Sequence, residues 1–368
     1  MKNILKKLSV IFWLTPFYIA VLLYFTLPHL NTFSEYAFSR GIFKVFSFVI
    51  GGLVSLIPIS LGEFLLILSP LMLIAVIVIF IIKLKKSKKK SATVAAFIKG
   101  VLFSVSCVFL LYMFMHGANY YRYSLDNLMG LEVKPREAQY LYEVTRDLAI
   151  RASAAREECT FDENGNMKLS ADIFEISKQV ENGYTYLYDD YPYLKGIVKR
   201  VKPVILLSHA WSYTGFSGVY FVWAGEANIN IDMPDFTIPS CAAHEIAHTR
   251  GIAKENECNF ISFLSCINSD YADYRYSGYM LALRNCLNQL YSADKELFND
   301  AYTYVSDGAY SDIVQLNEYL DQFEGEVNEA AGNFNDNFIK VQGVESGAKS
   351  YGEMVDLVLA YYDEYNLV

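Results

Sequence analysis

The chain has 368 residues, of which 53% are hydrophobic and only 19% are charged, and its formal net charge is −9. The apolar excess lies in residues 1–116, whereas the acidic excess lies in residues 117–368. An acidic C-terminal part argues against nucleic acid as a partner, and the length leaves room for one domain of ordinary size beside a membrane region.

Apolar runs of spanning length predict three transmembrane helices, at residues 8–27, 64–82 and 97–115. Residues 31–60 mix basic and aromatic side chains, so we expect them to lie at the membrane interface, with a further span as the alternative. Six lysines between residues 83 and 90 indicate a cytoplasmic loop. The sequence therefore predicts a multi-pass protein of the cell membrane, with residues 117–368 forming an extracytoplasmic domain.

One carboxylate stands at the outer edge of the second predicted span. Glu63 follows Ser60 and Gly62 there, and a charge so close to hydrocarbon is costly unless it has a partner. Two interpretations are open: Glu63 connects the membrane part to the outer domain, or it is an acid favoured by the dipole at a helix N-terminus.

Beyond the membrane, hydrophobic periodicity predicts helices over residues 134–155, 171–189 and 273–290. Residues favourable to β-structure predict short strands at 203–207, 219–223 and 227–231. The fold class is thus α+β, with transmembrane helices followed by a mostly helical domain that contains a small β-sheet. We expect Glu226 and Asn228 to be solvated residues of an edge strand, with the lining of a cleft as the alternative.

The motif that carries chemistry lies in residues 244–248, which read His-Glu-Ile-Ala-His, the pattern H-E-x-x-H. Residues four apart share one face of a helix, so both imidazoles can reach one metal ion while Glu245 holds a water. Small apolar neighbours predict that this helix is buried, with Pro239 before it and Ser240 as its N-cap. We expect Gly251 to end it by adopting a positive φ.

A catalytic Zn²⁺ site needs a third protein ligand beside His244 and His248, so that a fourth position stays open. We expect this ligand to be Glu255, on a second helix, with Glu257 as the alternative. Asn259 shares a helix face with Glu255, and we expect it to hydrogen-bond one of the ligand histidines.

The pattern H-E-x-x-H followed by E-x-x-x-[DN] resembles the glutamate zincins, in which the later Glu is the third zinc ligand and the Asp or Asn supports a His. The wider chain is similar to a bacterial membrane-anchored family of unknown function in that group, through stretches that include residues 60–63, 119–122, 225–228 and 276–279. This resemblance implies a zincin-like domain, peptidase activity, and pairing of the substrate main chain with a strand edge within residues 218–230.

These observations predict a membrane-anchored zinc peptidase that acts on a peptide or protein substrate. The metal lowers the pKa of a bound water, Glu245 takes its proton, and hydroxide attacks a peptide carbonyl. Tyr276, Tyr279 and Tyr351 are candidate donors to the oxyanion. The alternative is a non-catalytic, membrane-tethered binding or scaffold protein whose zinc is structural or absent.

The six cysteines show no C-x-x-C spacing, which argues against a cysteine-rich zinc site. Cys258 and Cys266 flank the predicted metal helices, and we expect them to be buried thiols.

Overall fold

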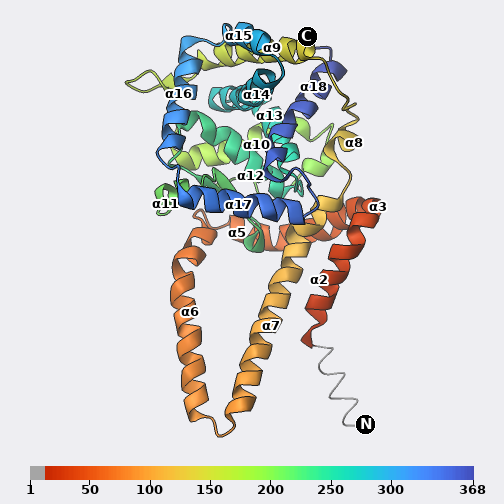
Figure 1. Ribbon diagram of the computed structural model, residues 1–368, viewed down its shortest axis with the longest axis vertical. Coiled ribbons are helices and arrows are strands. Elements are labelled where there is room, and N and C mark those ends of the chain that lie inside the picture. Colours follow the sequence, from red (N-terminus) through yellow and green to blue (C-terminus); the bar gives the residue numbers. More distant parts are fainter. Residues whose placement is uncertain (1–12) are drawn as a thin grey trace.

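Long apolar helices form the lower part of the molecule, beneath a helical domain (Figure 1). The computed structural model describes residues 13–368. Helices α6 (Leu61–Lys86) and α7 (Lys90–Met115) extend away from the domain and are joined by a short turn. Within the described residues, these two helices and the stretch Asn31–Ser55 are long and apolar enough to cross a membrane. The predicted spans 64–82 and 97–115 lie inside α6 and α7.

The N-terminal part differs in detail from the predicted spans. Helix α2 (Thr15–Thr26) covers most of the predicted span 8–27, and residues 8–12 lie outside the described residues. Residues 31–55 form a nearly continuous helix that passes beneath the domain, across the direction of α6 and α7 (Figure 1). Its successive parts are α3 (Asn31–Phe33), η2 (Ser34–Ile42), α4 (Phe43–Phe46), η3 (Ser47–Gly51) and α5 (Gly52–Ser55).

The stretch beneath the domain is attached to the domain by its charged residues. Lys44 Nζ donates to the backbone oxygens of Tyr193 and Arg250, at 2.9 and 3.1 Å. Buried Glu35 accepts from Arg122 Nε at 2.8 Å. A charge is buried only where such partners offset its desolvation, so these contacts fix the stretch against the base of the domain.

The domain is mostly helical. Its α-helices are α8 (Leu125–Met129), α9 (Ala138–Arg156), α10 (Ile173–Leu187), α11 (Ser208–Ser212), α12 (Ile238–Thr249), α13 (Glu255–Ile267), α14 (Ala272–Ala293), α15 (Lys295–Tyr302), α16 (Asp307–Asp321), α17 (Glu326–Val341) and α18 (Met354–Glu364). Short 3₁₀ helices include η4 (Gly117–Tyr121), η6 (Val222–Ala224) and η8 (Gly347–Glu353). The three predicted helices correspond to α9, α10 and α14. Helix α10 starts late because Asp172 caps it, accepting from the amides of Phe174 and Glu175.

A three-stranded sheet packs against the helices. It consists of β3 (Lys202–Val204), β4 (Gly218–Phe221) and β5 (Glu226–Asn230), in the order β3-β5-β4. β3 is parallel to β5 and β4 is antiparallel to it, with Gly218 opposite Ile229. The three predicted strands are therefore present: each begins one residue earlier than predicted, and β3 and β4 are also shorter. A hairpin of β1 (Thr160–Phe161) and β2 (Met167–Lys168), which we did not predict, lies apart from this sheet.

Glu63 joins the membrane helices to the sheet. Its carboxylate accepts from the amides of Ile205, Leu206 and Leu207 at 3.2, 2.5 and 2.8 Å, which ends β3 earlier than predicted. Ser60 caps α6, because its hydroxyl accepts from the Glu63 amide at 2.9 Å. Both interpretations of Glu63 thus hold: it lies in the first turn of a helix, and it contacts the domain.

Glu226 makes a second connection between the membrane helices and the sheet. Its carboxylate accepts from the amides of Leu61 and Gly62, at 3.1 and 3.0 Å, and pairs with Lys202. The side chain is buried, and so is that of Asn228, so the expectation that these two residues are solvated was wrong. An N-terminal helix end attracts a carboxylate through its free amides and its dipole, which explains why this acid is buried there.

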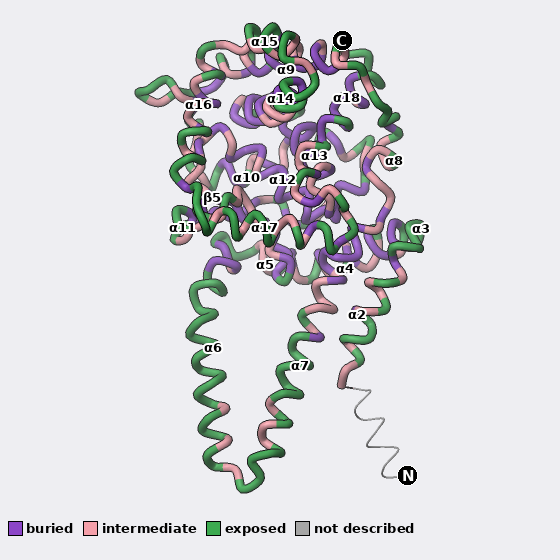
Figure 2. The backbone as a smooth tube through the Cα atoms, viewed as in Figure 1, coloured by how far each residue is buried: buried purple, intermediate pink, exposed green. Residues whose placement is uncertain are grey.

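Helix α12 lies in the core of the domain, which is the predominantly buried region in Figure 2. It contacts β4 and β5 on one side and α10, α13 and α14 on the other. Every residue of α12 except Cys241 is buried. The H-E-x-x-H motif is therefore held by packing on all sides rather than displayed on a surface helix.

Candidate metal centre

Helix α12 presents the motif after a start that differs from the prediction. It begins at Ile238, so Pro239 lies in its first turn and Ser240 is a helical residue rather than the N-cap. Proline is favoured in the first turn because the amide it lacks has no partner there anyway. The helix ends where predicted: Gly251 has φ +88°, and the Ile252 amide donates back to Ala247 O at 3.3 Å.

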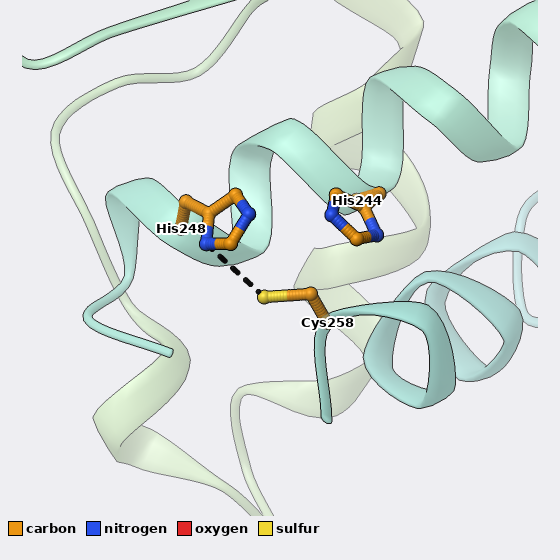
Figure 3. Close-up of side chains that lie close together, drawn as sticks. All are labelled: His244, His248 and Cys258. Carbon is orange, nitrogen blue, oxygen red and sulfur yellow. Dashed lines mark hydrogen bonds between the residues drawn. The ribbon is translucent and has the colours of Figure 1, made fainter. Parts of the chain in front are cut away.

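Three side chains converge where α12 faces α13. His244 and His248 lie one turn apart with ring centroids 4.9 Å from each other (Figure 3). Glu255, at the start of α13, places Oε2 at 3.0 Å from His244 Nε2 and 3.6 Å from His248 Nε2. Oε2 of Glu255 thus faces the Nε2 atoms of both rings. This is the donor set of a two-histidine, one-carboxylate zinc site.

Hydrogen bonds on the far side of each ring define which nitrogen faces Glu255. His244 Nδ1 lies 2.7 Å from Asn259 Oδ1, and the Asn259 amide group donates in turn to Tyr351 O at 3.2 Å. His248 Nδ1 lies 3.0 Å from Ile252 O. Both Nδ1 atoms face oxygen acceptors and therefore donate, so a metal bound to either neutral ring would take Nε2, the nitrogen that faces Glu255. Asn259 occupies the place that the sequence predicted for it.

Glu255 is ionised in this environment. Burial alone raises the pKa of its carboxyl group, but the facing imidazoles, His248 foremost, outweigh burial and hold the pKa below its usual value. A buried anion that faces two imidazole nitrogens is compensated by those rings and by any cation bound between them.

Cys258 is another side chain near the two histidines that could bind a metal ion. Ligand atoms of His244, His248 and Cys258 lie within 4.8 Å of one another. Its Sγ lies 3.3 Å from His248 Nδ1 (Figure 3), on the side of the ring that bonds Ile252 O, whereas Glu255 lies on the Nε2 side. Burial raises the pKa of this thiol well above its usual value, so the thiol is neutral in the metal-free protein. The geometry favours Glu255 over Cys258.

Glu245 lies beside this centre with one carboxyl oxygen unbonded. The side chain is buried, and Oε2 has no hydrogen-bond partner. It lies against β4 so closely that a Cβ on Gly218 would stand 2.5 Å from Oε1. Burial raises the pKa of Glu245 to about 8, although His244 opposes the shift. A buried polar atom without a partner is costly, so the residues here fit a bound, hydrated cation.

The other predicted site residues divide into two groups. Tyr351, on η8, stacks on His244 with ring centroids 6.3 Å apart. Glu257 turns away from the histidines, because its carboxylate accepts from the Leu125 amide at 3.1 Å. Tyr276 donates to Asp312 in the core, and Tyr279 packs edge-on against Phe263. Glu257, Tyr276 and Tyr279 are therefore absent from the metal centre.

Two residues from the end of the membrane region also reach the centre, and sequence reasoning missed them as site residues. His116 stands at the end of α7 with its ring centroid 5.5 Å from that of His248. Tyr120 is buried in η4 with an unpartnered hydroxyl, and after burial, the carboxylate of Glu255 is the main cause of its raised pKa. Residues 119–122 belong to the family resemblance, but spacing alone does not connect them to a motif more than a hundred residues away.

A family model described as "Protein of unknown function (DUF3810)" matches residues 38–359. No curated protein and no solved structure matches the chain. The matched residues run from the stretch beneath the domain to α18, so they include both the membrane helices α6 and α7 and the candidate metal centre.

Proposed function

The chain belongs to the DUF3810 family, and we propose that it is a membrane-anchored zinc peptidase. One observation carries the proposal: a carboxylate oxygen of Glu255 faces Nε2 of both His244 and His248, and the buried carboxyl group of Glu245 lies beside them with an oxygen that lacks a partner. Two imidazoles, one carboxylate and an adjacent general base are the composition of a hydrolytic zinc site.

Each residue has a distinct role in this proposal. Zn²⁺ held by His244, His248 and Glu255 would supply Lewis-acid chemistry, polarising a carbonyl and activating water. Glu245 takes a proton from the attacking water and delivers it to the leaving amine nitrogen. Its buried carboxyl group has an oxygen without a hydrogen-bond partner, which can accept this proton.

In this proposal, two tyrosines stabilise the charge that develops on the carbonyl oxygen. Tyr351 stacks on His244, and Tyr120 is buried with a free hydroxyl. After burial, Glu255 is the main cause of the raised pKa of each hydroxyl, which supports the view that both lie near the metal ligands. Neutral hydroxyl donors of this kind are what an oxyanion requires.

The runner-up is a structural zinc in a non-catalytic scaffold, and Cys258 is the observation in its favour. A thiolate from Cys258 would add a fourth protein ligand and close the position that water needs. This alternative requires His248 to turn its Nδ1 away from Ile252 O and the buried thiol to lose its proton. The peptidase needs neither change.

We also propose that the catalytic domain is extracytoplasmic. Six lysines lie between residues 83 and 90, where α6 and α7 meet at their far ends, and a loop of this charge is retained in the cytoplasm. The ends of both helices near the domain then lie on the outer side. Trypsin added to intact spheroplasts should digest the domain, and full protection would contradict this sidedness.

The test of the peptidase uses the full chain in lipid nanodiscs, with zinc measured by mass spectrometry and hydrolysis measured on a peptide library. We expect about one zinc per chain. Glu245→Gln should retain the zinc and lower hydrolysis by about 10²–10⁴-fold. The matched control is Glu257→Gln, a buried acid on α13 that faces away from the histidines. Unchanged hydrolysis in Glu245→Gln, or a wild-type protein without zinc, overturns the proposal.

A further inference from the structure

An apolar pocket of about 400 Å³ lies where the membrane helices meet the sheet. Residues from α5, α6, α7, the end of β4 and η6 line it, among them Val54, Leu65, Val108, Phe221 and Trp223. All of its lining residues are apolar. The lining includes residues of all three stretches that are long and apolar enough to cross a membrane among the described residues.

The pocket is placed where a bilayer would meet the domain. Leu65 lies in the second turn of α6, and Val108 lies two turns before the end of α7, so both belong to the halves of these helices nearer the domain. Both side chains are exposed, as is that of Trp223. Figure 1 shows α6 and α7 apart near the domain and together at the opposite end, and there Phe80 and Phe97 stack.

Strand β4 connects this pocket to the candidate metal centre. Its first residue, Gly218, lies against the carboxyl group of Glu245, and its last, Phe221, lines the pocket. Three residue steps along a strand span about 10 Å. β4 is at the edge of its sheet, and an edge strand can pair with the main chain of an extended peptide.

These three observations identify a class of substrate. Resting on the proposed function, we propose that the protein cleaves membrane-spanning polypeptides in the extended segment that leaves the bilayer. The span of the substrate lies between α6 and α7 with its last apolar residues in the pocket. The chain then continues along β4, and the bond beside Glu245 is cut.

A membrane-spanning polypeptide fits this site better than a lipid chain, because the pocket borders the end of strand β4. β4 provides hydrogen-bonding groups at the spacing of a peptide, which an acyl chain cannot use. The distance between the pocket and Glu245 also determines how far from its apolar span the substrate is cut. The cut falls about three residues beyond the apolar span, since the strand covers about 10 Å between pocket and Glu245.

The test compares three probes on the full-length protein in nanodiscs. One is a leucine-alanine span followed by a randomised tail, the second is the same tail as a free peptide, and the third is the tail carried on a palmitoyl chain. We expect kcat/KM for the spanning probe to be at least about tenfold above the other two, the effect of about 1.4 kcal/mol of apolar contact. Sequencing of the released fragments should place the cuts within about three to five residues of the span.

A pair of variants connects this preference to the pocket. Leu65→Trp fills the pocket and should reduce cleavage of the spanning probe to the rate of the free tail, while cleavage of the free tail is unchanged. Ile74→Trp, on an exposed position of the same helix outside the pocket, should change neither rate. Zinc content at the wild-type level shows that each variant is folded.

The outcomes separate this inference from the proposed function. Equal cleavage of spanning and free probes, or a Leu65→Trp variant that cleaves the spanning probe normally, overturns the inference and leaves a zinc peptidase. Equally fast cleavage of the palmitoyl probe also overturns it, because the pocket would then take a lipid chain. If the wild-type protein cleaves no probe, both proposals fail.

Discussion

Two regions of this molecule bury an acid, and they treat it in opposite ways. At the junction with the membrane helices, Glu226 accepts from the amides of Leu61 and Gly62 and pairs with Lys202. At the candidate metal centre, Glu245 is buried to a similar degree, yet its Oε2 has no partner. The first acid is compensated by its surroundings, whereas the second has a buried carboxyl oxygen that no hydrogen bond compensates.

The difference shows how to distinguish a structural acid from a functional one. A buried carboxylate with complete hydrogen bonding contributes to the architecture, and its removal leaves a charge behind. A buried carboxyl group with a free oxygen beside convergent ligands costs stability, and such a cost is typical of a functional site.

Loss of a ligand histidine should have the largest effect, on zinc affinity. Asn259 only orients the His244 ring, so we expect Asn259→Ala to lower zinc affinity by about 10–100-fold. His244→Ala removes the imidazole itself and should lower zinc affinity further. Titration against a competing chelator measures both. His209→Ala, an exposed histidine paired with Asp232, is the matched control. A His244→Ala variant with the zinc affinity of the wild-type protein would show that His244 is not a metal ligand.

At the junction, Glu226→Ala should destabilise the protein by about 3–5 kcal/mol, because it leaves Lys202 buried without its partner. Glu245→Ala should cost far less, since it removes a group that is itself poorly satisfied. Chemical denaturation of the metal-free protein compares the two. Equal losses of stability would show that the contrast between the regions is not real.

The pH dependence of stability sharpens the same contrast. In the metal-free protein, burial raises the pKa of Glu245 from 4.5 to about 8, so the folded state binds more protons than the unfolded state in this window. Its contribution to stability is present below pH 4.5 and is lost as the pH rises towards 8. Glu245→Gln should therefore stabilise the metal-free protein increasingly between pH 5 and pH 8. A constant difference between the two proteins across this range would contradict the raised pKa.

The smallest effect is expected for Cys258→Ala. The thiol contacts the side of His248 that bonds Ile252 O, so its loss should change zinc affinity by less than about tenfold. Cys266→Ala, a buried thiol on the same helix, controls for the loss of packing. A change as large as that of His244→Ala would assign Cys258 to the ligand set.

Local spacing predicted the centre of this site well. The four-residue interval of His244 and His248, the turn at Gly251, and the shared face of Glu255 and Asn259 are all properties of helices and turns, which depend on neighbours in sequence. The small sheet was also predicted, because strand-forming residues and turn signals are local.

The parts that sequence reasoning missed depend on tertiary contacts. Glu226 reads as a solvated residue on a strand until the N-terminus of α6 is placed against it. Tyr120 looks like one of many interfacial tyrosines, and only the fold brings it near Glu255. Ser240 is a good N-cap by type, but packing and Pro239 let α12 begin earlier. No pattern within a short window carries such information.

The most direct test of the central claim is X-ray absorption at the zinc edge of the full-length protein in nanodiscs. The account predicts two imidazole nitrogens with the remaining donors all oxygen, at about 2.0–2.2 Å, from Glu255 and water. A sulfur donor at about 2.3 Å would instead identify Cys258 as a ligand and the site as structural. A protein that binds no zinc would contradict the account altogether.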